Sequence, residues 1–203
     1  MSYQDLNFDG QETALIAQAW AEGVLDWNNK ALQGIRSKIR NLHREILKDR
    51  CCYCRKHFMD DHPLAVDIEH VLPKSKFKSL AISPVNLTVA CKRCNMTIKK
   101  DRIDFLNGLS VADLEASFES SDAYEIIHPN LDNYHEHIKL DMVSINESTL
   151  CRYRVKDESK KGLRTVEYFE LRSLEVDNLD EIQGIDEKSG SQRAAAIRDL
   201  LGV

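Results

Sequence analysis

CCYC at residues 51–54, DIEH at 67–70 and NLTVACKRCN at 86–95 are the stretches that decide how the middle of this 203-residue chain folds. Two Cys-x-x-Cys pairs lie 36 residues apart, and each presents two thiolates at the spacing that tetrahedral zinc requires. The pattern therefore predicts a structural zinc site, with Cys51, Cys54, Cys91 and Cys94 as its ligands. A redox Cys-x-x-Cys motif and free buried thiols are the alternatives. Cys52 has the wrong spacing for a ligand and Cys151 has no partner, so both are expected to be packing residues.

Length and composition set the broad class of protein. A chain of 203 residues suits one domain, or a small core with appendages, and can bury a hydrophobic core of its own. No run of 18 apolar residues occurs, so no membrane span is expected. The first ten residues are polar and acidic, which argues against a secretory signal. With six cysteines, this favours a reducing compartment and predicts a cytoplasmic protein.

The net charge of −5 conceals an uneven distribution. Residues 30–104 carry 17 Lys or Arg against 8 Asp or Glu, so the rest of the chain is strongly acidic. A polyanion would bind the middle of the chain and be repelled by its ends. The simpler explanation of this positive charge is that the lysines and arginines lie on solvated helix faces. The metal-site residues lie in the same segment, however, and this favours a nucleic-acid partner.

The expected secondary structure is mixed. Apolar residues recur at spacings of three and four over 11–27 and 29–48, which predicts two N-terminal helices. Short strands are expected at 64–69 and 86–90, followed by a helix at 92–100.

A change of character after Asp104 predicts a C-terminal extension. Its expected elements are a helix at 110–118, strands at 139–145, 150–156 and 164–171, a hairpin turn at 157–162, an acidic linker at 175–187 and a terminal helix at 191–201. The predicted fold class is α+β, with a central core, N-terminal helices and a small α/β C-terminal extension. The predicted domain division is 1–50, 51–106 and 107–203.

The central residues form a recognisable order: Cys-x-x-Cys, then Asp-x-Glu-His-x-x-Pro-Lys-Ser, then Asn-Leu, then Cys-x-x-Cys-Asn with a Lys shortly after. This order resembles the HNH endonuclease family, whose core is a ββα-metal finger and many of whose members carry a four-cysteine zinc. The resemblance covers residues 51–102, about a quarter of the chain. It implies that His70 is the general base, that Asn86 orients His70, and that Glu69 and Asn95 hold a catalytic divalent cation.

The chemistry of these side chains supports the same roles. A neutral imidazole is a suitable base for activating water near neutral pH. A carboxylate and an amide oxygen suit a hard cation such as Mg²⁺ or Mn²⁺, which offsets charge that develops on a phosphodiester. The family usually has Asp where this chain has Glu69, and Asp67, two residues earlier, could share the metal.

Three lysines near the motif are candidate phosphate-binding residues. Lys99 follows Asn95 by four residues, where three is usual, and Lys100 and Lys74 also lie close to the motif. Ordinary solvated lysines are an equal alternative for all three.

The C-terminal half carries a weaker resemblance. Ile127-His128-Pro129-x-x-Asp132, His137-Ile138 and Gly162-x-x-Thr165 are similar to the tail of the Septu PtuB proteins and of related retron effectors, which accompany an ATPase in bacterial anti-phage systems. The resemblance implies a PtuA-like ATPase partner subunit, since this chain has no Walker motif of its own.

Two functions are therefore in competition. The first is a metal-dependent endonuclease that hydrolyses DNA, and the same fold could equally be an RNA-cutting toxin because such cores contact backbone more than bases. The second is a non-catalytic zinc ribbon that binds nucleic acid or protein. Glu69-His70 with Asn95 favours the first, since a binding ribbon needs no base beside a metal site.

Overall fold

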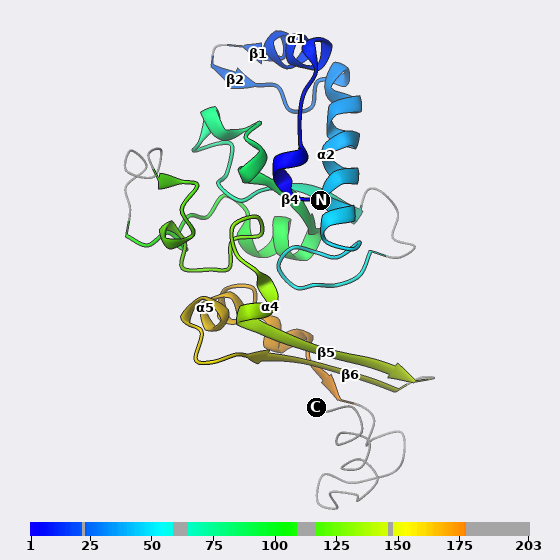
Figure 1. The fold of residues 1–203 in the computed structure, drawn as a ribbon, viewed down its shortest axis with the longest axis vertical. Coiled ribbons are helices and arrows are strands. Elements are labelled where there is room, and N and C mark those ends of the chain that lie inside the picture. The colour runs from blue at the N-terminus through cyan, green and yellow to red at the C-terminus, as the bar shows by residue number, and fades with distance from the viewer. Residues whose placement is uncertain (22, 59–64, 109–116, 146–147, 178–203) are drawn as a thin grey trace, which may run out of the picture. The chain divides into compact units, whose positions relative to one another are not determined.

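The fold is described from a computed structural model, which covers residues 1–21, 23–58, 65–108, 117–145 and 148–177 (Figure 1). Its contacts divide the chain into two compact units, 1–133 and 134–203. The prediction of an α+β fold is confirmed, with small antiparallel sheets among short helices. The division at 51 and 106 remains a prediction. In the described residues no helix is long and apolar enough to cross a bilayer.

The chain begins with a short 3-10 helix, η1 (Tyr3–Asp5), and the helix α1 (Gly10–Gln18). Asp9 caps α1, because its carboxylate accepts from the backbone N–H of Glu12. The Glu12 carboxylate in turn accepts from the backbone N–H of Asp9.

The prediction that this helix continues to Trp27 is wrong. The chain instead turns into a hairpin of two short strands, β1 (Trp20–Ala21) and β2 (Val24–Leu25). Gly23 adopts a φ of 73°, which glycine tolerates and a helix does not allow, and the N–H of Asp26 bonds the carbonyl of Ala19.

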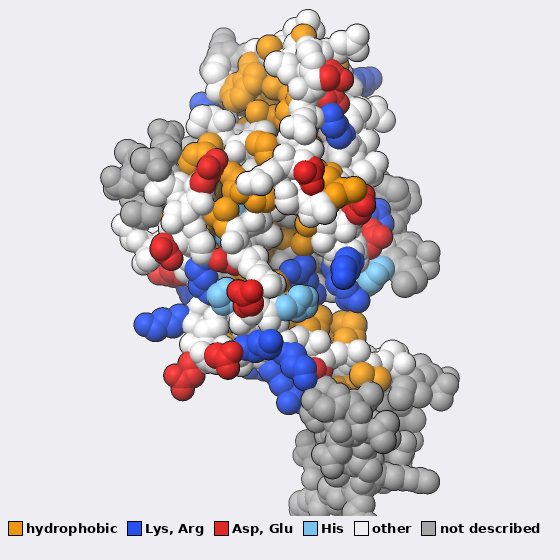
Figure 2. All heavy atoms as spheres, viewed as in Figure 1, with side chains coloured by type: hydrophobic (Ala, Val, Ile, Leu, Met, Phe, Trp, Pro, Cys, Tyr) orange, Lys and Arg blue, Asp and Glu red, His pale blue; other side chains and the backbone are white. Residues whose placement is uncertain are grey.

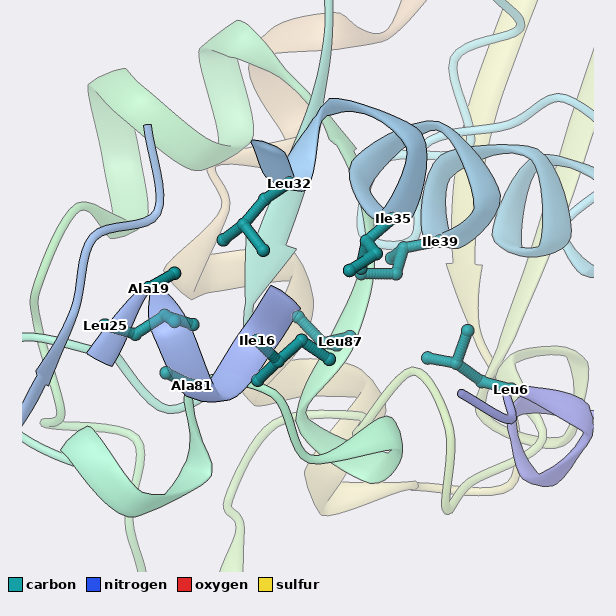
Figure 3. Packing of buried hydrophobic residues seen from close by; sticks show 9 residues of the cluster. All are labelled: Leu6, Ile16, Ala19, Leu25, Leu32, Ile35, Ile39, Ala81 and Leu87. Atoms are coloured by element: carbon teal, nitrogen blue, oxygen red, sulfur yellow. The ribbon is translucent and has the colours of Figure 1, made fainter. Parts of the chain in front are cut away.

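The second predicted helix is confirmed as a 3-10 turn, η2 (Lys30–Leu32), followed by α2 (Gln33–Ile46). Its apolar face, with Leu32, Ile35 and Ile39, packs into the main hydrophobic cluster (Figure 3). The other members of that cluster come from separate parts of the chain: Leu6, Ile16, Ala19, Leu25, Ala81 and Leu87. The cluster therefore ties the N-terminal elements to the central strands.

The predicted central order of strand, loop, strand and helix is confirmed. Strand β3 (Val66–His70) pairs antiparallel with β4 (Leu87–Cys91), with Val66 opposite Cys91 and His70 opposite Leu87. The loop between them contains two 3-10 turns, η4 (Lys78–Leu80) and η5 (Pro84–Asn86). A single π-helical segment, η6 (Arg93–Lys99), follows β4, and the 3-10 turn η7 (Ser121–Ala123) lies later in this unit.

The C-terminal unit contains a short helix, α4 (Tyr134–His137), and a three-stranded antiparallel sheet of β5 (Ile138–Ile145), β6 (Ser148–Val155) and β7 (Val176–Asp177). The two long strands confirm the predictions for this region. Strand β7 lies where an acidic linker was expected.

The predicted strand at 164–171 is wrong, because these residues belong to the helix α5 (Lys160–Tyr168) and the 3-10 turn η8 (Leu171–Leu174). The predicted hairpin turn at 157–162 is also wrong. Ser159 caps α5 by accepting from the N–H of Gly162 at 3.0 Å, so the helix begins inside that segment. A Cβ on Gly162 would lie 2.7 Å from the carbonyl oxygen of His137, so only glycine fits there. The predicted helix at 191–201 and most of that at 110–118 lie outside the described residues.

Candidate active site

The four predicted zinc ligands converge. The sulfur atoms of Cys51, Cys54, Cys91 and Cys94 all lie within 4.8 Å of one another, and all four side chains are buried. The Sγ atoms of Cys54 and Cys91 are 3.7 Å apart. A tetrahedral zinc with bonds of about 2.3 Å separates its sulfur ligands by about 3.8 Å, so the thiols fit this ion.

Backbone hydrogen bonds place the first cysteine pair beside the end of β4. The N–H of Cys52 donates to the carbonyl of Val89 at 3.1 Å, and the N–H of Cys91 donates to the sulfur of Cys51 at 3.4 Å. The cluster thus joins the turn at 51–54 to the end of β4 and the start of η6. Strand β3, which carries Glu69 and His70, pairs with β4, and Asn95 lies in η6, so both are linked to the cysteine cluster.

His70 ends β3 and is 8% exposed. Its Nε2 lies 3.0 Å from the carbonyl oxygen of Ala81, and its ring meets the edge of the Trp27 ring at 4.7 Å between centroids. A carbonyl can only accept, so Nε2 carries the proton and Nδ1 is left unprotonated. Burial lowers the pKa of His70 to about 4, which keeps the imidazole neutral at pH 7.

Glu69 is buried between two polar partners. Its Oε1 accepts from the hydroxyl of Tyr53 at 3.1 Å and lies 2.8 Å from the Nζ of Lys99. Burial raises the pKa of the Glu69 carboxyl, and the charge and hydrogen bond of Lys99 oppose that rise. Tyr53 lies inside the first cysteine pair, so the cysteine cluster and Glu69 share Tyr53 as a neighbour.

The prediction that Lys99 contacts phosphate is corrected by its surroundings. Its side chain is 1% exposed, and its Nζ donates to the carbonyl of His70 at 2.8 Å while it pairs with Glu69. The ring of Phe105 lies 5.9 Å from the same ammonium. Lys99 ends the π-helical segment η6, and its side chain lies against β3, where it holds both Glu69 and the carbonyl of His70.

Asp67 and Asn95 are both partly buried and are joined by a hydrogen bond. The Asn95 Nδ2 donates to Oδ2 of Asp67 at 3.1 Å, and the Nζ of Lys92 lies 2.7 Å from Oδ1 of Asp67. The amide of Asn95 therefore presents its nitrogen to Asp67, which leaves its oxygen as the atom suited to a cation.

A cavity of about 310 Å³ brings the predicted residues together. Glu69, His70 and Asn95 line it, together with Lys74 and Lys100. Both lysines are exposed, as a phosphate contact requires. Asp67 is not among the lining residues and reaches the site through Asn95.

Asn86 is buried, and its side chain bonds to the backbone of Leu72 and Leu80 and not to His70. Its Oδ1 accepts from the N–H of Leu72 at 2.6 Å, and its Nδ2 donates to the carbonyls of Leu72 and Leu80. The contact predicted for Asn86 is made by the Ala81 carbonyl instead. The Asn86 side chain links the backbone at Leu72 to that at Leu80, the residue before Ala81.

Three residues of this site, Tyr53, Trp27 and Ala81, were not predicted from the sequence. Tyr53 and Trp27 belong to no sequence motif, and Ala81 contacts His70 through its backbone carbonyl, which no residue type predicts. The position of Tyr53 between two zinc ligands was the one available signal.

Residues 51–101 match the family model described as HNH endonuclease. This segment is an HNH endonuclease domain. The chain is 28% identical over 131 residues to the Septu protein PtuB of Bacillus thuringiensis, a match that covers 64% of this chain and 40% of the relative. It is 24% identical over 149 residues to the Septu protein PtuB of Bacillus mycoides, covering 68% of this chain and 48% of that relative. The chain thus spans less than half the length of either relative, and no solved structure gives a significant match.

Proposed function

We propose that this protein is a metal-dependent HNH endonuclease that hydrolyses phosphodiester bonds in DNA, as the nuclease of a bacterial anti-phage defence system. One observation carries the proposal. A buried, neutral His70 lines the same cavity as Glu69 and Asn95, the carboxylate and amide that a hard cation prefers. A zinc ribbon that only binds would have no use for this combination.

His70 acts as the general base. Its Nδ1 takes a proton from a water molecule while the water oxygen forms a bond to phosphorus, and the bond from phosphorus to the leaving oxygen breaks. The departing oxygen is then protonated from solvent. Ala81 keeps Nε2 protonated throughout, so the ring presents one tautomer and one orientation.

Glu69 and Asn95 would hold the catalytic Mg²⁺ or Mn²⁺, and Asp67 would support them through its contact with Asn95. A cation held there would supply positive charge that offsets the charge gained by the phosphate oxygens in the transition state. Lys99 and Tyr53 fix one carboxylate oxygen of Glu69, so its position is set before any cation arrives. Lys74 and Lys100, on the rim of the cavity, bind phosphates of the substrate.

The zinc of the four-cysteine site has a structural role in this proposal. Its ligands are all protein thiols, so no coordination position is left for a substrate. Loss of the ion would release the turn that carries Tyr53.

The defence role and the ATPase partner in this proposal come from the resemblance to the Septu PtuB proteins, and DNA is the substrate that the cleavage assay below tests. Both matched proteins are Septu PtuB proteins. A PtuA-like ATPase subunit would place nucleotide control outside this chain, and the C-terminal region, 107–203, is the proposed partner-binding part. The protein is expected to act in the cytoplasm, where its zinc thiolates stay reduced.

The test is a cleavage assay with purified, zinc-loaded protein and supercoiled plasmid or single-stranded RNA in the presence of Mg²⁺. We expect nicking or linearisation of the plasmid, with loss of at least 100-fold in rate for His70→Ala. The matched control is His57→Ala, which changes a partly exposed histidine outside the cavity. Equal rates for His70→Ala and the unaltered protein would refute the mechanism. Cleavage of RNA alone would replace DNA as the substrate.

A further inference from the structure

A second cavity, of about 240 Å³, lies next to the catalytic one. Its lining residues are Val24, Leu25, Lys74, Ser75, Lys78 and Ala81. Lys74 and Ser75 line both cavities, so the loop after His70 forms a shared rim. The two cavities therefore meet at Lys74 and Ser75, and the first of them is lined by His70.

The N-terminal hairpin is fixed in this position by packing. Leu25 and Ala81 belong to the same buried cluster, and they lie close to Ala19 in Figure 3. Trp27 follows the hairpin and contacts His70 by its ring edge. Arg36 holds this turn from helix α2, since its guanidinium donates to the carbonyl of Trp27 at 2.6 Å. The wall of the second cavity is thus connected to the catalytic ring through defined contacts.

The lining has the chemistry of a nucleotide subsite. Lys74 and Lys78 are exposed, and no Asp or Glu lines the cavity. Val24 is 46% exposed although it is apolar, and Figure 2 shows hydrophobic side chains at the surface over these N-terminal elements. Ammonium groups pair with phosphates, while an apolar side chain packs against a sugar or the face of a base.

We infer that the N-terminal hairpin and the loop at 74–81 form a binding subsite for the nucleotide next to the scissile phosphate. This inference rests on the proposed nuclease function and extends the substrate path beyond the segment matched by the HNH family model. The occupant is a nucleic-acid strand that continues out of the catalytic cavity. Lys78 binds its phosphate, and Val24 contacts its sugar or base.

The test is a binding titration with fluorescently labelled DNA and RNA oligonucleotides, in single-stranded and duplex form, with every protein carrying His70→Ala to prevent cleavage. Lys78→Glu is expected to weaken binding at least tenfold at 0.1 M salt and to reduce the slope of log K against log salt by about one. Val24→Asp, which adds a carboxylate to the same cavity, is expected to weaken binding without changing the melting temperature, because the residue is half exposed.

Lys48→Glu is the matched control, because it makes the same charge change at an exposed lysine that lines neither cavity. If Lys78→Glu and Val24→Asp bind as tightly as Lys48→Glu, the subsite does not exist. That result leaves the proposed function intact as long as the unaltered protein cuts. Failure of the unaltered protein to cut any nucleic acid contradicts the proposed function itself.

Discussion

Replacing Lys99 by methionine tests whether this lysine supports the site from within the fold. The Lys99 ammonium and the Glu69 carboxylate are both 1% exposed and 2.8 Å apart. Methionine is close to lysine in length and apolar, so the change removes the charge and the two hydrogen bonds with little loss of packing. Glu69 would then be a buried carboxylate without its cation, and the carbonyl of His70 would lose its donor.

We expect Lys99→Met to lower the free energy of unfolding by about 3–5 kcal/mol, the usual cost of breaking a buried ion pair on one side. The assay is urea denaturation of zinc-loaded protein without Mg²⁺, where a slope of about 2 kcal/mol/M converts this loss to a midpoint shift of roughly 2 M. The double variant Glu69→Met with Lys99→Met should recover most of the loss, because it leaves no unpaired charge.

Lys48→Met is the control for removing a lysine charge, and it should change stability by less than about 0.5 kcal/mol because that side chain is exposed. The reasoning is refuted if Lys99→Met costs less than about 1 kcal/mol. It is also refuted if the double variant is as unstable as the single one, since the loss would then not come from an unpaired Glu69.

Three further outcomes follow from the site and the core. Cys54→Ser should lose zinc, measured by metal analysis, and expose the 65–91 segment to limited proteolysis, whereas Cys151→Ser should keep its zinc. Asn86→Ala should cost about 2–4 kcal/mol in urea denaturation and slow cleavage, because two backbone carbonyls and one N–H lose their buried partner; unchanged stability would contradict this. His43 is buried with neither ring nitrogen hydrogen-bonded, and burial lowers its pKa to about 4. Its neutral form therefore contributes stability above pH 6.5 that is lost as the pH falls toward 4, so His43→Leu should reduce the loss of stability between pH 7 and 5 by about 2 kcal/mol; the same fall in both proteins would contradict the assignment.

Local patterns predicted the central fold well. The spacing of three and four that predicts a helix over residues 29–48 is a property of the helix itself, and the structure confirms it with η2 and α2. The cysteine pairs were equally clear, because a zinc ligand set depends on short-range spacing.

Predictions failed where packing between distant segments outweighed local preference. Trp20 and Val24 fit a helical face, but the chain turns at Gly23 and buries Leu25 against Ala81 instead. Thr165 and Val166 favour a strand, yet they lie in a helix that begins at the Ser159 cap.

The sequence by itself determined the four clustered cysteines and predicted the histidine, carboxylate and amide that line one cavity, because these depend on residue type and on short-range spacing. Only the tertiary structure decided which lysines can meet a substrate. Lys99 and Lys100 are adjacent in the chain, yet one is buried against Glu69 and the other is exposed at the cavity. The tautomer of His70 and the surroundings of Glu69 are set by groups elsewhere in the sequence, the Ala81 carbonyl and Tyr53. No local pattern predicts where those groups will lie.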